Sequence, residues 1–137
     1  MKQINAYLHF DGNCREAMTF YKQCLGGELT LQSVGESPMA GQMSAQEQDK
    51  ILHAQLKIGE VLLMASDMMG PGGLKTGNGI SLSIVGSGRQ EVEGFFSRLS
   101  EGGKVSHPLK EEFFGLHGNL TDRYGVNWML THEPPRA

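Results

Sequence analysis

The chain has 137 residues, of which 39% are hydrophobic, and a formal net charge of −3. This composition excludes a wholly disordered chain, and no apolar run approaches the ~18 residues that a membrane-spanning helix needs. No excess of positive charge favours nucleic acid or anionic membranes as partners, which leaves small molecules and proteins. Glycine occurs 19 times, about twice the usual frequency of ~7%, and predicts many turns.

The beginning of the chain and its two cysteines bear on location. The N-terminal residues lead directly into an alternating pattern, without the basic and apolar regions of a secretory signal, so we expect a cytoplasmic protein. Cys14 and Cys24 cannot form a disulfide framework, and their spacing fits no Cys-x-x-Cys motif. We interpret both as small hydrophobic residues on a helix face.

Strict alternation over residues 4–10 predicts a first strand. Its apolar face carries Ile4, Ala6, Leu8 and Phe10, and its other face carries Asn5, Tyr7 and His9. A helix is predicted to follow, because Asn13 and Glu16 stand at capping-box spacing and Gly26-Gly27 provides a stop. The helix has one apolar stripe, formed by Cys14, Ala17, Met18, Tyr21 and Leu25.

The remainder of the first half is predicted to be mostly strand. We expect a strand over 28–34, a polar, flexible excursion over 35–50, and a hairpin over 51–67 that turns at Gly59. Residues 68–73 contain too many Gly and Pro residues for regular structure, so we predict a connection there.

The same pattern begins again in the second half. Residues 79–84 alternate like the first strand, and Ser87 and Gln90 stand at capping-box spacing before a second helix. That helix carries a stripe of Val92, Phe95, Phe96 and Leu99 and ends at Gly102-Gly103. Further strands are predicted over 104–109, 116–121 and 126–132, with a turn at 122–125.

The repeated order indicates an internal duplication. We therefore predict an α+β fold, a single domain over 1–137 built from two tandem βαβββ modules at 3–68 and 78–133. Each module has one helix and too few strands to bury both faces of its sheet. The helices should cover the convex side of a cupped mixed sheet, and the concave side is where a functional site would lie.

Four blocks of residues, in this order along nearly the whole chain, resemble the PhnB-like family of the vicinal oxygen chelate superfamily. That superfamily includes glyoxalases, extradiol dioxygenases and bleomycin-resistance proteins. The blocks are Tyr7-Leu8-x-Phe10-x-Gly12-Asn13-Cys14-x-Glu16-Ala17-x-x-Phe20-Tyr21, His53-Ala54-x-Leu56-x-Ile58-Gly59, Leu63-Met64-x-Ser66-Asp67 and Thr121-Asp122-x-x-Gly125-Val126-x-Trp128-Met129. The resemblance implies the glyoxalase/bleomycin resistance fold and a homodimer, and pairing would also cover exposed strand edges.

Metal-dependent members of the superfamily bind a divalent ion through His or Glu on the first and last strands of each module. In this chain the corresponding positions hold Asn5, Met64, Asn78 or Gly79, and Met129. Thioethers prefer soft metals, and Asn is a weaker ligand than carboxylate or imidazole. We therefore predict that the usual metal site is absent and that no cofactor is required.

Two histidines keep an enzymatic alternative open. His9 and His53 lie on predicted strands of the first module, and Asp67 ends the adjacent strand, so an atypical divalent metal site of these three is conceivable. Either histidine could instead act as a general base. The alternative function is a metal-dependent or histidine-based lyase, isomerase or dioxygenase-type enzyme. Methyl transfer ranks below both, since no glycine-rich strand-to-helix turn is present to hold a nucleoside cofactor.

The residues predicted to line the cup combine hydrogen-bonding groups with adaptable apolar surface, which suits a small organic ligand. They are Asn5, Tyr7, His9, His53, Met64, Ser81, Ser83, Phe114, Asn127 and Met129, with Phe113 and Thr131 as further candidates.

Other residues are interpreted as structural or solvent-exposed. Trp128 has the opposite parity to Met129 and should face the helix layer, and Asp122 belongs to a turn. Glu111 and Glu112 are predicted to be solvated on a loop. His107, His117 and His132 are placed near strand ends or loops.

Overall fold

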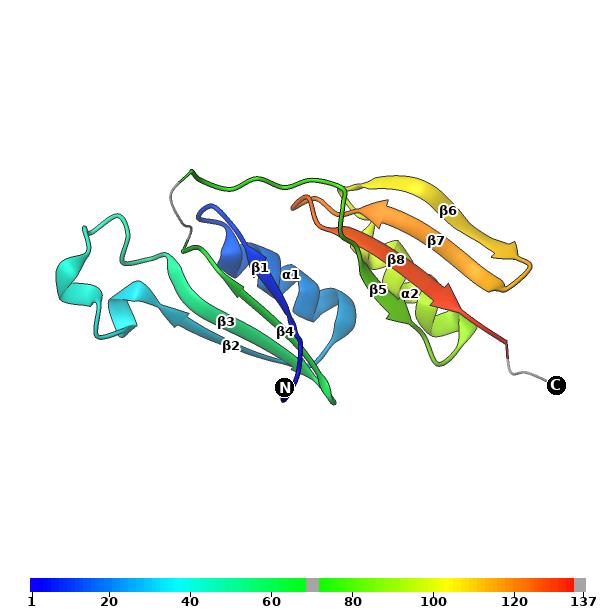
Figure 1. Ribbon diagram of the computed structural model, residues 1–137, viewed down its shortest axis with the longest axis horizontal. Helices are drawn as coiled ribbons and strands as arrows, with labels where there is room; N and C mark the ends of the chain where they lie inside the picture. The colour runs from blue at the N-terminus through cyan, green and yellow to red at the C-terminus, as the bar shows by residue number, and fades with distance from the viewer. Residues whose placement is uncertain (69–71, 135–137) are drawn as a thin grey trace. The chain divides into compact units, whose positions relative to one another are not determined.

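A computed structural model describes residues 1–68 and 72–134 of the chain (Figure 1). Two units can be distinguished, Met1–Lys75 and Thr76–Ala137, and each is treated by itself. Of the predicted connection at 68–73, residues 69–71 lie outside the described part. None of the helices within the described ranges is long and apolar enough to span a membrane.

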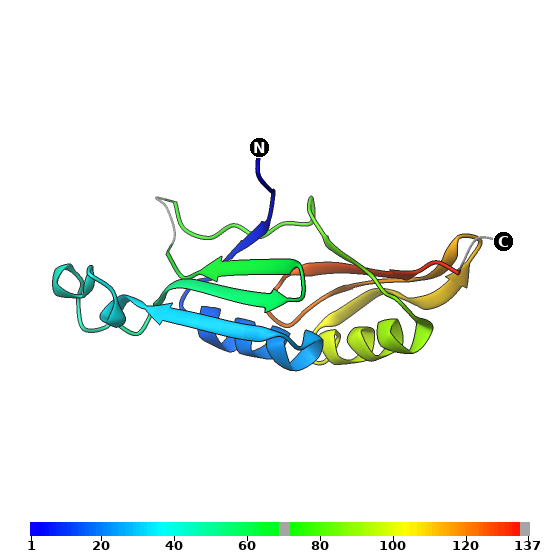
Figure 2. The same ribbon diagram turned by 90° about the horizontal axis from the view of Figure 1, so that it is seen from below.

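The first unit contains one helix and a four-stranded sheet. Its elements are β1 (Ala6–His9), α1 (Cys14–Leu25), β2 (Glu28–Ser33), the short 3-10 helices η1 (Val34–Glu36) and η2 (Ala40–Gln42), β3 (Ile51–Ile58) and β4 (Val61–Ser66). The strand order is β1-β4-β3-β2. β1 runs parallel to β4, whereas β4, β3 and β2 are antiparallel neighbours. Figure 2 shows α1 on one side of these strands, so the opposite side of the sheet carries no helix of this unit.

The second unit repeats this topology. It comprises β5 (Leu82–Val85), α2 (Arg89–Leu99), β6 (Lys104–Glu112), β7 (Gly115–Thr121) and β8 (Asn127–His132). The strand order is β5-β8-β7-β6, with β5 parallel to β8 and the other pairs antiparallel. The predicted α+β class and the duplicated βαβββ order are therefore confirmed.

Strand alternation and the helix stripe together form the core of the first unit. The alternating residues Ala54 and Leu56 of β3 are fully buried, as is Met18 of α1. Burying a side chain such as Leu or Met contributes about 1.5–3 kcal/mol. Ile4 was expected on this apolar face, but it is 83% exposed because β1 begins only at Ala6.

The core of the second unit is built in the same way. Trp128 and Leu130 of β8 are buried together with Val92 and Phe96 of α2, so the prediction of a core tryptophan is confirmed. β7 contributes Gly118 beneath the helix, where an added Cβ would lie only 2.7 Å from Cε2 of Phe96. Because Gly118 has no side chain, the phenyl ring of Phe96 can pack against the strand at this position.

The predicted capping boxes are wrong in both helices. The side chain of Asn13 makes no capping hydrogen bond, and the N-terminal residue of α2 is capped by Gly88, which has no side chain. The amides of Gly12 and Cys14 instead donate to Oδ1 of Asp67 at 2.9 Å, from the end of β4. The α1 helix is thus capped by a residue far away in the sequence.

Several strand limits also differ from the predictions. The first strand of the second unit begins at Leu82, which places Ser81 outside it. β6 continues to Glu112, so Glu111 and Glu112 belong to a strand rather than a loop. The predicted excursion at 35–50 contains η2 and is fastened by hydrogen bonds from the amides of Val34 and Gly35 to the carbonyls of Lys50 and Gln48, both 2.8 Å.

Candidate functional site

The face of the first sheet that α1 does not cover carries a row of polar and aromatic side chains. Tyr7 of β1 is in register with Met64 of β4, which is in register with Gln55 of β3. His9 and His53 share this face by alternation, since Ala6, Leu8 and Ala54 point towards the core. The predicted side of the first strand is therefore correct for Tyr7 and His9.

Three of the predicted site residues form one cluster on this face, which we call the Tyr7 cluster: Tyr7, His9 and His53. The Tyr7 hydroxyl lies 3.0 Å from Nδ1 of His53, a hydrogen-bond distance. The Tyr7 ring centroid lies 5.7 Å from that of His53 and 5.3 Å from that of His9. Tyr7 remains 40% exposed, so the rings stay accessible to a molecule in solution.

The hydrogen bond explains how residues from two strands come together. Tyr7 and His53 lie on β1 and β3, and β4 runs between these strands. The tyrosine side chain on β1 therefore reaches the imidazole on β3, two strands away. The bond engages Nδ1 of His53, so the other ring nitrogen is the one that can meet a ligand, as a donor or an acceptor according to the tautomer.

Asp67 does not join this cluster. Its Oδ1 accepts the amides of Gly12 and Cys14, and its Oδ2 accepts the amide of Ile51 at 2.8 Å. The side chain is buried, with 3% exposure. Both oxygens thus serve the backbone, and the described residues contain no set of three His, Cys, Asp or Glu side chains placed to hold a metal ion.

The positions that correspond to the superfamily's usual metal ligands are a poor fit for a divalent ion. Asn5 precedes β1, and Met64 and Met129 lie on β4 and β8. Thioether sulfur does not match the hard oxygen and borderline nitrogen donors that such ions prefer. The donor set in this chain therefore does not support that metal.

On the second sheet, the predicted residues divide into a structural and an accessible group. Asn127 donates through Nδ2 to the carbonyls of Gly77 and Ile80 at 2.8 and 3.2 Å, and it accepts from the hydroxyl of Thr121 at 2.8 Å. It therefore fastens the segment before β5. Ser83 and Met129 are in register on the face opposite to α2, and Ser81 is exposed ahead of the strand.

Asn119 was missed by the sequence analysis. It is in register with Met129 and shares its face. Its Oδ1 is buried, and no described residue donates a hydrogen bond to it. A buried acceptor without a donor costs about 1–3 kcal/mol, so this oxygen is a place where a ligand's donor would bind favourably. The alternation of β7 would have indicated the face on which Asn119 lies. The burial of its Oδ1 atom, however, depends on neighbouring strands that the sequence does not show.

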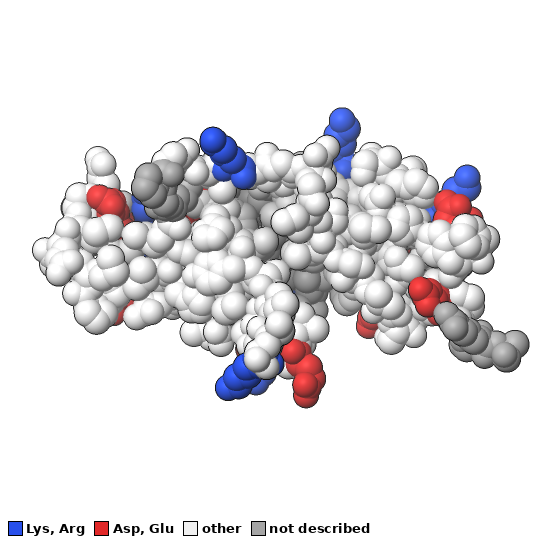
Figure 3. All heavy atoms as spheres, viewed as in Figure 1, with Lys and Arg blue, Asp and Glu red and all other residues white. Residues whose placement is uncertain are grey.

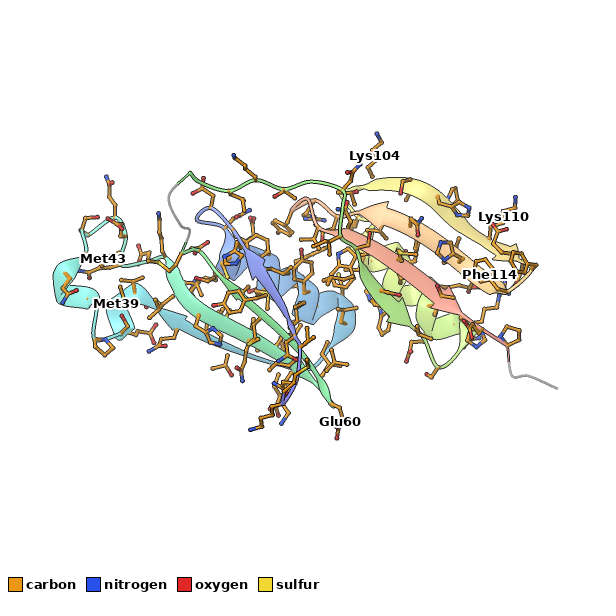
Figure 4. All side chains as sticks on the ribbon, in the orientation of Figure 1. Met39, Met43, Glu60, Lys104, Lys110 and Phe114 are labelled. Atoms are coloured by element: carbon orange, nitrogen blue, oxygen red, sulfur yellow. The ribbon has the colours of Figure 1, made fainter. Side chains whose placement is uncertain are left out.

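A second group of rings lies along β6 and β7. The ring centroid of His117 lies 5.5 Å from that of His107 and 5.6 Å from that of Phe114. Both histidines lie within strands, not near strand ends or in loops as predicted. Phe114 was predicted to line a ligand site, and it lies at the turn between the two strands, where Figure 4 shows it at the same end of the hairpin as Lys110.

One face of the molecule shows how its basic side chains are spread. On the face shown in Figure 3, the visible Lys and Arg side chains stand apart from one another, without a continuous basic surface.

The fold defines the class of protein. A glyoxalase-related enzyme from Fulvimarina pelagi matches with a TM-score of 0.63 and 16% identity, covering 100% of this chain and 94% of that chain. The fosfomycin resistance protein FosX from Listeria monocytogenes matches with a TM-score of 0.66 and 11% identity, covering 98% and 94%. At such identities the likeness shows the fold alone, which is the predicted glyoxalase/bleomycin resistance fold.

One family matches almost the entire chain. The family model described as 3-demethylubiquinone-9 3-methyltransferase matches residues 2–131. Protein YjdN of Escherichia coli K12 is 33% identical over 137 residues, with 93% of this chain and 92% of YjdN covered. Protein PA1353 from Pseudomonas aeruginosa is 41% identical with a TM-score of 0.86, covering 97% and 98%. The PhnB protein from Bacillus cereus is 26% identical with a TM-score of 0.74, covering 96% and 99%. The chain therefore belongs to this PhnB-like family.

Proposed function

We propose that the protein binds a small, planar organic molecule on the open face of the first sheet, at the Tyr7 cluster. The observation that carries this proposal is the hydrogen bond of 3.0 Å between the Tyr7 hydroxyl and Nδ1 of His53, with the His9 ring beside it. Three rings held in this way offer stacking surface together with hydrogen-bonding edges. Binding sites for small molecules combine such apolar area with a few polar groups in fixed positions.

The polar edges of the Tyr7 cluster also bear on the ligand class. The Tyr7 hydroxyl and the imidazole of His53 are hydrogen-bonding groups on the open face of the first sheet. We therefore favour a molecule with hydrogen-bonding groups over a pure hydrocarbon.

We further propose that binding does not use the superfamily's divalent metal. The support is the chemistry of the side chains at the corresponding positions, Asn5, Met64 and Met129, which are poor ligands for such an ion. In this proposal, the Tyr7 cluster replaces metal coordination with hydrogen bonds and stacking.

Methyl transfer, which the family's description names, receives less support from this chain. A nucleoside cofactor is often held by free amides at the beginning of a helix. In α1 the amides of Gly12 and Cys14 already donate to Asp67.

Proton transfer is the second candidate function, and the same hydrogen bond favours it. With Nδ1 of His53 engaged by Tyr7, the remaining ring nitrogen could exchange a proton with a bound substrate. Isomerases and lyases that act next to a carbonyl group need such a base. This activity would use the same ligand site and would add proton transfer to binding.

Binding can be tested by measuring the melting temperature of the full chain against a panel of planar heteroaromatic and conjugated carbonyl compounds. Ligand at about 100 times its dissociation constant adds about 2.7 kcal/mol to the free energy of unfolding. Compounds that stabilise the natural protein should lose most of this effect with Tyr7→Phe and His53→Ala, and keep it with His132→Ala. A panel whose hits stabilise all four proteins equally would refute the proposed site.

Turnover is tested on the same hits. Each compound is incubated in deuterated water with catalytic amounts of protein, and NMR follows exchange next to its carbonyl group. Exchange that is lost with His53→Ala would support proton transfer, whereas binding without exchange would support the ligand-binding function alone.

A further inference from the structure

We propose that the second unit carries a ligand site of its own, formed by His117 and Asn119 of β7 and Met129 of β8. Its ligand is a flat heterocycle in which a ring N–H lies next to a carbonyl oxygen, as in a cyclic amide. The site goes beyond the proposed function, because the Tyr7 cluster belongs to the other unit and contributes no residue to it. The duplicated sequence, the unpaired oxygen of Asn119 and the rings beside it each point to this face.

The internal duplication repeats the polar residues of the open face. The segment His53-Ala54-Gln55-Leu56 of β3 corresponds to His117-Gly118-Asn119-Leu120 of β7. The register agrees with the sequence, since the carboxamide of each segment is paired with a methionine of the next strand, Met64 in β4 and Met129 in β8. Gly118 faces Phe96 of α2, so the histidine and the carboxamide on either side of it point away from the helix. Each unit thus presents a histidine, a carboxamide and a methionine on its open face.

In each unit a hydroxyl group holds the histidine ring. Nδ1 of His117 lies 3.1 Å from Oγ1 of Thr131, and Nδ1 of His53 lies 3.0 Å from the Tyr7 hydroxyl. The two hydroxyls come from different strands, β8 in the second unit and β1 in the first. The same ring nitrogen is therefore engaged in both units by different residues, and the other nitrogen of the ring takes no part in this bond.

Asn119 determines the polar chemistry of the ligand. Its Oδ1 atom is buried and accepts no hydrogen bond from the described residues. A carboxamide carries an acceptor and a donor side by side, so it pairs with a molecule that has a donor next to an acceptor. Asparagine binds adenine in this bidentate way in protein–DNA complexes. A cyclic amide has the same pattern of groups, and its N–H would satisfy the buried oxygen.

The rings on the same face account for the flat shape of the ligand. His107 of β6 is in register with Asn119, and its ring centroid lies 5.5 Å from that of His117. The ring centroid of Phe114 lies 5.6 Å from that of His117, and Phe114 is 40% exposed. Flat rings pack on such groups in offset or edge-to-face arrangements. Met129, in register with Asn119, has a flexible, unbranched side chain that can turn aside and admit the ligand to the buried oxygen.

The test is an NMR titration of the isotope-labelled full chain with 2-pyridone, a flat cyclic amide. The signals of His117 and Asn119 should shift. N-methyl-2-pyridone, which lacks the N–H, should bind at least about tenfold more weakly, because leaving a buried acceptor unpaired costs a factor of this order. This pair of compounds tests the proposal on the natural chain, whether or not a variant folds.

Two variants test the role of the carboxamide. Asn119→Leu should weaken the binding of 2-pyridone by the same factor. Gln55→Leu is the matched control, because it removes the equivalent carboxamide from the other unit, and it should leave the affinity measured at His117 unchanged.

The NMR signals report on the two units separately. The proposal is overturned if 2-pyridone does not shift the signals of His117 and Asn119, or if its N-methyl derivative binds as tightly. It is also overturned if Asn119→Leu binds 2-pyridone as tightly as Gln55→Leu does. Shifts confined to His9 and His53 would overturn it as well, while leaving the proposed function of the first unit intact. A response of His117 that persists in His53→Ala would confirm that the second site is independent of the Tyr7 cluster.

Discussion

Asp67→Ala is expected to destabilise the protein strongly, although Asp67 has no place in the proposed ligand site. The side chain is buried and accepts three backbone amides, those of Gly12, Cys14 and Ile51, at 2.8–2.9 Å. These bonds join the end of β4 to the beginning of α1 and the beginning of β3. Removing the carboxylate leaves three donors without a partner in the interior.

The magnitude follows from counting these donors. A buried polar group without a hydrogen bond costs about 1–3 kcal/mol. Because water can reach part of the site once the side chain is truncated, we expect a total loss of about 3–6 kcal/mol rather than the full sum. A domain of ordinary stability has only about 5–15 kcal/mol. Asp67→Asn keeps one oxygen for Gly12 and Cys14 but turns an amide group towards the Ile51 amide, so it should cost roughly half as much.

Urea unfolding followed by circular dichroism measures these changes, with Asp11→Ala as the control. Asp11 lies in the same turn but is exposed, and its loss should change the free energy of unfolding by less than about 0.5 kcal/mol. If the Asp67→Ala protein were as stable as the Asp11→Ala protein, Asp67 would not hold these three backbone amides in the folded protein.

Three further outcomes are expected. Gly118→Ala should cost ~1–3 kcal/mol of stability, because its Cβ would press on Phe96 and on the β6 backbone, whereas Gly79→Ala, with open space around it, should be neutral in the same urea assay. Burial, with a smaller contribution from a neighbouring carboxylate, raises the pKa of the Cys14 thiol from 9.0 to about 12. The native thiol should therefore resist alkylation at pH 8, and Cys14→Ala should remove part of the fall in unfolding free energy between pH 9.0 and 12, where only the unfolded thiol ionises. Light scattering should give twice the chain mass of 15.0 kDa, and a monomer mass at micromolar concentration would contradict the expected homodimer.

The elements of the fold were predictable because their signals are local. The alternation around the first strand and the stripe of Met18 and Tyr21 depend only on the spacing of neighbouring residues. The stripe appears in the structure, and the alternation appears over Ala6–His9. The capping of α1 was not predictable in this way. Asn13 has a side chain of the right type at the right place, but Asp67 occupies the amides from 53 residues away in the sequence.

The candidate site could likewise be predicted only where a local pattern determines it. Alternation assigns Tyr7 and His9 to the open face, but it does not say which neighbour Tyr7 meets. The contact with His53 depends on the strand order β1-β4-β3, which places the two residues on either side of β4. The contact between His107 and Glu112, whose Nε2 and Oε1 atoms lie 3.4 Å apart, could not be predicted for a related reason. It requires a register shift that the alternation of β6 does not reveal.

Some of the residues that carry the family resemblance build the fold, and their presence therefore says little about chemistry. Asp67 from one motif block caps α1, and Asp122 from another accepts the indole N–H of Trp128 at 2.8 Å and the amide of Tyr124 at 2.8 Å. Both carboxylates are buried and serve the backbone or the core. A chain can keep these residues while it changes the side chains on the open faces of its sheets, because successive residues of a strand point to opposite sides. In our proposal the function lies with Tyr7 and His53, which lie on the face of the first sheet that α1 leaves uncovered.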